Sequence, residues 1–144
     1  MKHSRLFTIA SWTCRAVTAV ILLQTLYFKF TAAPESVYIF STLGLEPEGR
    51  IGSGIAELIA AILILIPRTV VYGAALSSAV ITGAIVSHVT KLGIALPLVD
   101  DHGELFTLAV VVFMCSVTIL VLHRNEIPSL RAGIAGNSPG MKNV

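Results

Sequence analysis

The sequence predicts an all-α protein, a four-helix transmembrane bundle with a short interfacial helix in its first outer loop. Its 144 residues are 55% hydrophobic and only 12% charged, whereas a soluble domain carries about 25% charged residues. A chain of this length cannot enclose so much apolar surface in its own core, so the sequence indicates that lipid is its solvent. The apolar residues also gather in four stretches separated by short polar segments.

Each of the four stretches comes close to the roughly 20 residues that a helix needs to cross a bilayer. They run over residues 6–28, 51–66, 69–89 and 105–122. Only Pro67 and Arg68 separate the second stretch from the third, which predicts a tight antiparallel hairpin, because proline ends the helix before it. The membrane domain is expected to cover residues 1–128, followed by a disordered tail over residues 129–144.

The first outer loop is expected to hold a short helix over residues 34–43, lying on the outer membrane surface. Pro34 suits the first turn of a helix, and Gly44 suits a helix stop. Tyr38 and Phe40 suit the aromatic belt at the membrane interface.

Basic residues in the short loops predict the orientation, because they favour the cytoplasmic side. On the side of the termini the basic residues are Lys2, Arg5, Arg68, Arg124, Arg131 and Lys142. The opposite loops carry Lys29, Arg50 and Lys91 among six acidic residues. Both termini are therefore expected in the cytoplasm. Because topology alone explains the basic residues, the sequence gives no sign of nucleic-acid binding.

Arg15 and Glu57 are ionisable residues inside the predicted spans, where charge is costly and normally faces the protein interior. Arg15 lies roughly 14 Å from the inner surface and Glu57 roughly 9 Å from the outer one, at 1.5 Å of rise per residue. The remaining axial gap is short enough for a candidate intramembrane ion pair, Arg15–Glu57, that organises the helices. Lys29 and His88 are the competing partners for Glu57.

A set of polar side chains in the outer half of the spans predicts a small polar pocket open to the outside. These candidates are Gln24, Tyr27, Lys29, Glu57, His88 and Lys91. A histidine there suits proton exchange, because imidazole titrates near neutral pH. The sequence shows no Ser/His/Asp set, no metal-binding signature and no phosphate-binding loop. We therefore expect no metal and no catalysis by this chain on its own.

Small residues on the third span predict close helix contact, inside the chain or in a homo-oligomer. The residues that share this face are Ala75, Ala79, Gly83 and Ser87. Cys14 and Cys115 lie at similar depths in the first and fourth spans, which can bring them together. Isolated thiols among apolar residues act mostly as small hydrophobes, so we expect no redox role for them.

Several segments resemble the DoxX family of small bacterial membrane proteins. They are residues 24–30 (QTLYFKF), 33–40 (APESVYIF), 49–57 (GRIGSGIAE) continuing to 66–68 (IPR), and 88–93 (HVTKLG). The resemblance covers roughly residues 6–128. It implies a four-helix fold in the bacterial cytoplasmic (inner) membrane. The family takes its name from a subunit of a membrane oxidoreductase that passes electrons from thiosulfate to quinone, and it offers no agreed catalytic residues.

The resemblance and the residues together leave three functional hypotheses. The favoured one is a noncatalytic accessory or anchoring subunit, associated with a membrane or peripheral oxidoreductase that brings the cofactor. The second is a quinone-binding redox component, in which the outer pocket takes the quinone head group. The third is a small proton-coupled carrier that uses Glu57.

Overall fold

The computed structural model describes residues 5–126, and this part of the chain is all-helical. The long helices are α1 (Arg5–Phe30), α3 (Glu48–Leu65), α4 (Val70–Ser87) and α5 (Glu104–Leu122). The shorter ones are α2 (Pro34–Leu43), the π-helical turn η1 (His88–Leu92), and the 3-10 turns η2 (Pro97–Val99) and η3 (Arg124–Glu126). The predicted tail, residues 129–144, lies outside the described residues.

Three of the helical segments are long and apolar enough to cross a membrane: α1, α4 continuing through η1, and α5. The first, third and fourth predicted spans are confirmed in this sense. Helix α3 has 18 residues but carries three charged ones, Glu48, Arg50 and Glu57. Its place relative to a membrane therefore depends on where those charges point.

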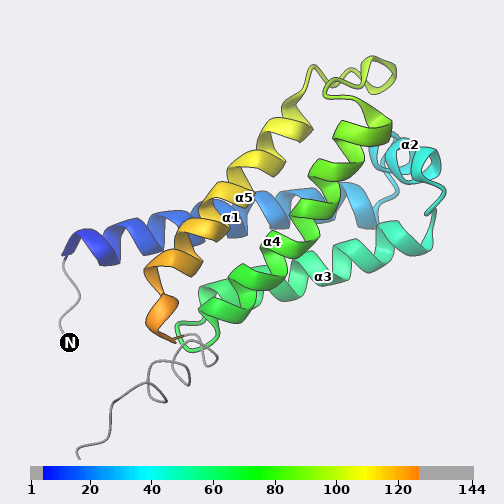
Figure 1. The fold of residues 1–144 in the computed structure, drawn as a ribbon. Helices are drawn as coiled ribbons and strands as arrows, with labels where there is room; N and C mark the ends of the chain where they lie inside the picture. The colour runs from blue at the N-terminus through cyan, green and yellow to red at the C-terminus, as the bar shows by residue number, and fades with distance from the viewer. Residues whose placement is uncertain (1–4, 127–144) are drawn as a thin grey trace, which may run out of the picture.

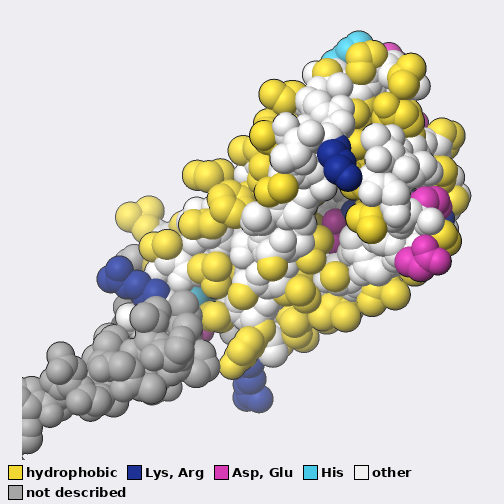
Figure 2. All heavy atoms as spheres, turned by 45° about the vertical axis from the view of Figure 1, so that its right-hand side comes forward, with side chains coloured by type: hydrophobic (Ala, Val, Ile, Leu, Met, Phe, Trp, Pro, Cys, Tyr) yellow, Lys and Arg dark blue, Asp and Glu magenta, His cyan; other side chains and the backbone are white. Residues whose placement is uncertain are grey.

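The four long helices pack as a closed ring (Figure 1). Helix α1 contacts α3 and α5, and α4 contacts the same two helices from the other side. One buried cluster, nearer the α2 end, consists of Leu22, Ala60, Ala61, Ile81, Ala109 and Val112. A second cluster, near the turn between α3 and α4, consists of Ile64, Val70, Ala74 and Ile119. Apolar side chains also cover much of the outer surface, with few charged ones between them (Figure 2).

A buried polar contact links α4 and α5. The hydroxyl of Ser116 on α5 donates to that of Ser77 on α4 over 2.9 Å, and both residues are fully buried. Cys14 on α1 and Cys115 on α5 lie close enough to interact, as their similar depths predicted. Both are free thiols.

The predicted small-residue face of α4 does not pack inside this chain. Ala75, Ala79 and Gly83 are exposed, while the buried residues of α4 are Val70, Gly73, Ala74, Ser77 and Ile81. The close contact falls instead at Gly73, where an added Cβ would lie 2.8 Å from the carbonyl carbon of Leu63. Residues 66–69 form a short turn between α3 and α4, so the two helices pack against each other directly next to the turn. A role of the exposed face in a homo-oligomer stays a prediction.

Helix α2 has the bounds that its sequence predicted. Pro34 occupies its first turn, and Gly44 ends it at φ 73°, a left-handed conformation that glycine adopts without strain. The amide of Leu45 closes the turn by donating to the carbonyl of Phe40 over 2.8 Å. Helix α2 contacts α1, α3, η1 and η2, so it covers one end of the ring. Its position on a membrane surface stays a prediction.

Candidate functional site

A cavity of about 650 Å³ lies at the end of the ring that α2 covers. All four long helices line it, together with α2, η1 and the segment before α5. Most of its wall is apolar, and Leu22, Ile81, Ala109 and Val112 from the first buried cluster form part of that wall. Cavities of this size with an apolar wall and few polar groups are typical of small-molecule sites.

Four of the six predicted pocket residues line this cavity: Gln24, Lys29, Glu57 and His88. The other two do not. Tyr27 and Lys91 are exposed, because Tyr27 lies on the outward face of α1 and Lys91 on the outward face of η1. Their position at the outer end of the helices was predicted correctly, but not the direction of their side chains.

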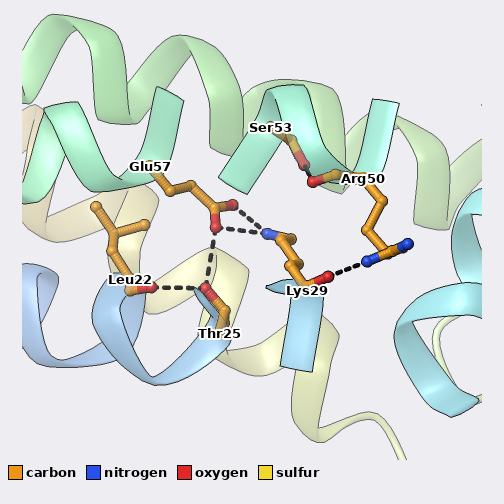
Figure 3. A network of polar contacts seen from close by, with 6 residues as sticks. All are labelled: Leu22, Thr25, Lys29, Arg50, Ser53 and Glu57. Atoms are coloured by element: carbon orange, nitrogen blue, oxygen red, sulfur yellow. Dashed lines mark hydrogen bonds and ion pairs between the residues drawn. The ribbon is translucent and has the colours of Figure 1, made fainter. Parts of the chain in front are cut away.

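Glu57 is the best-connected polar group in the wall. Its residue is 3% exposed, and its carboxylate lies 2.5 Å from the Lys29 ammonium. The Thr25 hydroxyl lies 3.0 Å from Oε2 of Glu57 and 2.8 Å from the carbonyl oxygen of Leu22 (Figure 3). The Thr25 hydroxyl is therefore within hydrogen-bond distance of both the carboxylate and a carbonyl of its own helix.

The backbone around Lys29 is held by α3 as well. Arg50 donates from Nη1 to the carbonyl oxygen of Lys29 (Figure 3). Its Nη2 lies 2.8 Å from Oε1 of Glu46. The helices approach closely here, because a Cβ at Gly54 would lie 3.2 Å from the Phe30 ring. This contact places Lys29 directly opposite Glu57.

The predicted Arg15–Glu57 ion pair is wrong. Arg15 donates from Nε to the carbonyl oxygen of Ile64 and from Nη2 to that of Leu65, each over 2.7 Å. These carbonyls belong to the last turn of α3, where the helix leaves its acceptors without partners. The Arg15 guanidinium also lies over the Trp12 ring, 3.9 Å from its centroid. Arg15 therefore caps α3, roughly two turns away from Glu57.

This capping role makes a specific prediction for Arg15→Lys. Lysine keeps the charge but lacks the planar fork that reaches two carbonyls together. The free energy of unfolding is therefore expected to fall by about 1.5–3 kcal/mol, the value of one hydrogen bond to a charged group. Reversible unfolding in mixed micelles measures it, with the exposed Arg68→Lys as the control. An unchanged stability would contradict the capping role.

His88 lies where α4 widens into the π-helical turn, a feature that often occurs at functional sites. Its Nδ1 lies 2.8 Å from the carbonyl oxygen of Gly93. A carbonyl only accepts, so Nδ1 carries a proton and donates. In the neutral ring this leaves Nε2 as an acceptor. The ring also makes a T-shaped contact with Phe106, centroid to centroid 5.8 Å.

Asp101 is a cavity residue that the sequence did not single out. It is 6% exposed, and its Oδ1 accepts a hydrogen bond from the amide of Leu105 over 3.1 Å. Its Oδ2 is buried without a hydrogen-bond partner. Asp101 lies four residues before the predicted span 105–122, outside the N-cap position, which in α5 is Gly103. Its place in the cavity depends on the Leu96–Asp101 bridge, for which the sequence gives no signal.

A Ser–His–carboxylate arrangement at the opposite end of the molecule was also not predicted from the sequence. The Ser11 hydroxyl lies 2.8 Å from Nε2 of His123, and Nδ1 of His123 lies 3.2 Å from Glu126. This order matches that of hydrolase triads. Ser11 is buried near the start of α1, however, where no substrate reaches it. These residues tie the start of α1 to the end of α5.

Comparisons with models of protein families, with curated proteins and with solved structures found no match. What the structure shows is an all-helical chain with three segments able to cross a membrane. Within the described residues, no group of three or more His, Cys, Asp or Glu side chains is arranged to hold a metal ion. Function is therefore argued from the cavity.

Proposed function

We propose that this chain is a four-span membrane protein that holds a lipophilic molecule in its outer cavity, as a noncatalytic accessory component of a membrane complex. The cavity carries this proposal. It is lined by residues of α1, α2, α3, α4 and α5, and its mostly apolar wall contains a few buried polar groups. That combination suits a molecule with an apolar body and one polar head.

The fourth span in this proposal is α3. Its outward face carries exposed isoleucines at helical spacing: Ile51, Ile55, Ile59 and Ile62. Of its three charges, Glu57 pairs with Lys29, Arg50 pairs with Glu46 near the helix end, and the exposed Glu48 lies in the first turn. Charge that is paired or lies near a helix end is tolerated in a membrane. A four-helix transmembrane bundle follows, with α2 at its outer surface.

The proposed setting follows from the loop charges and from the resemblance to the DoxX family. Basic residues on the side of the termini support a cytoplasmic position for both ends. The resemblance supports a bacterial inner membrane, and an oxidoreductase as the partner that this chain assists.

The alternative hypotheses have weaker support. A quinone offers only carbonyl acceptors, and the ammonium of Lys29, the one cationic side chain lining the cavity, is already bound by Glu57. A proton-coupled carrier is expected to have broken helices at its site, and α4 departs from α-helical geometry only at its end, in η1.

The proposal is tested by native mass spectrometry of the detergent-purified protein with its bound small molecules. Gly83 lines the cavity, and an added Cβ there meets no atom within 4 Å, so Gly83→Leu is chosen to add apolar volume at the cavity wall. Gly52 has equally open space but does not line the cavity, so Gly52→Leu is the matched control. We expect a lipophilic adduct on the wild type and on Gly52→Leu, and its loss from Gly83→Leu. A wild type that carries no adduct, even after incubation with a membrane lipid extract, would overturn the proposal.

A further inference from the structure

We propose that the outer cavity selects lipophilic cations, molecules with an alkyl or aryl body and a primary ammonium head that Asp101 and His88 bind. This inference rests on the proposed function, since it names the class of molecule that the cavity holds. It follows from which charged groups in the wall still lack a partner.

The charges that line the cavity are mostly negative. Its carboxylates are those of Glu35, Glu57, Asp100, Asp101 and Glu104, and the ammonium of Lys29 is its one cationic side chain. Lys29 is bound to Glu57. Of the other four carboxylates, none has a Lys or Arg partner within ion-pair distance among residues 5–126. A cleft lined by charge of one sign attracts ligands of the opposite sign and repels like ones.

Asp101 is the carboxylate that gives this charge a defined position. Unlike Asp100, whose side chain is 98% exposed, Asp101 is buried. Among residues 5–126, the one hydrogen-bond donor to its side chain is the amide of Leu105. A buried carboxylate needs a counter-ion or further donors. Protein groups supply neither to Oδ2. Oδ2 itself is not accessible from the cavity, so a ligand ammonium supplies both once the carboxylate turns toward it.

His88 supplies a second acceptor. Because Nδ1 donates to the Gly93 carbonyl, Nε2 of the neutral ring offers its lone pair to a donor. A primary ammonium has three N–H donors, so it can satisfy Asp101 and His88 together. A quaternary ammonium has none, and an alkyl sulfate brings a negative charge. The apolar wall, including Phe28, Leu108 and Val112, takes the body of the molecule.

The experiment compares eight-carbon probes that differ only in the head group: octylammonium, octanol, octyltrimethylammonium and octyl sulfate. Binding to the full chain in nonionic detergent is measured by isothermal titration calorimetry. We expect octylammonium to bind about tenfold or more tightly than octanol, as one charge-assisted hydrogen bond implies. Octyltrimethylammonium is expected to bind more weakly than octylammonium, and octyl sulfate weakest of all.

A variant pair assigns the selectivity to Asp101. Asp101→Asn keeps an oxygen for the Leu105 amide but removes the charge, so octylammonium should bind about ten- to a hundredfold more weakly. Glu48→Gln removes an exposed charge that does not line the cavity and is the control, with little expected change. The head-group comparison on the wild type needs no variant, so it decides the inference even if Asp101→Asn does not fold.

Two results would overturn the inference. Octanol or octyl sulfate might bind the wild type as tightly as octylammonium, or folded Asp101→Asn might keep full affinity for octylammonium. If Gly83→Leu still abolishes that binding, the cavity holds a lipophilic molecule and only the choice of a cation is wrong. If no probe binds the wild type, both the cation selectivity and the proposed cavity function fail.

Discussion

Glu57→Gln is expected to lower the free energy of unfolding by about 3–5 kcal/mol, because it leaves the Lys29 ammonium buried without a counter-ion. The side chains of Lys29 and Glu57 are 14% and 4% exposed, so water solvates neither well. Thr25 can still hydrogen-bond to the new amide, but that bond replaces no charge. Reversible unfolding in mixed micelles measures the change. Glu48→Gln on the same helix is the control, because Glu48 is exposed.

A double-mutant cycle separates the ion pair from other effects of the substitution. Lys29→Met alone is expected to be similarly destabilising, because it leaves the Glu57 carboxylate unpaired. The combined Lys29→Met, Glu57→Gln variant should recover much of the loss, since removing both partners of a buried pair is often nearly neutral. Additive losses would show that the two side chains do not stabilise each other, and a stable Glu57→Gln would leave Glu57 free for a functional role.

Lys29 and Arg15 together explain how a helix with three charges keeps its place beside α1. Arg15 donates hydrogen bonds to the last carbonyls of α3, and Lys29 pairs with Glu57 in the middle of α3. Arg50, near the start of α3, donates to the carbonyl of Lys29. These contacts follow the length of the α1–α3 interface. They leave the cavity side of Lys29 and Glu57 without surplus positive charge, which is why the remaining carboxylates dominate the cavity.

Most of the fold could be predicted from the sequence. Apolar stretches long enough to cross a bilayer, and helix ends marked by proline or glycine, are local signals. The start and end of α2 at Pro34 and Gly44 are the clearest case. The sequence did not predict which face of α4 packs against the other helices. Small residues occur on two of its faces, and only the turn at Pro67 brings Gly73, rather than Gly83, against another backbone.

The candidate site was readable in part. Depth along the helices correctly grouped Gln24, Lys29, Glu57 and His88 at one end. Depth alone could not rank the partners of Glu57, because the competing acceptors for Arg15 are backbone carbonyls, which every residue has. Asp101 was missed for a related reason. Its burial comes from the fold of residues 96–101 against each other, not from a pattern in the sequence.

Gly73→Ala is expected to be strongly destabilising, because its methyl group would collide with backbone. A Cβ at Gly73 meets the amide nitrogen of Ile64 and lies 2.8 Å from the carbonyl carbon of Leu63. Overpacking a core commonly costs about 1–3 kcal/mol when side chains can move aside. Here the backbone of α3 must move, within a hairpin too short to adjust, so we expect a loss of about 3 kcal/mol or more.

The matched control for this prediction is Gly83→Ala on the same helix. A Cβ there has no atom within 4 Å, and alanine favours the helix over glycine by about 1 kcal/mol, so stability should be unchanged or slightly higher. Purified yield, size-exclusion profile and melting temperature are compared in one detergent. Because both variants make the same chemical change, helix propensity cannot explain a difference between them. A Gly73→Ala protein as stable as Gly83→Ala would show that α3 and α4 do not approach at Gly73, and the ring of four helices would need a different closure.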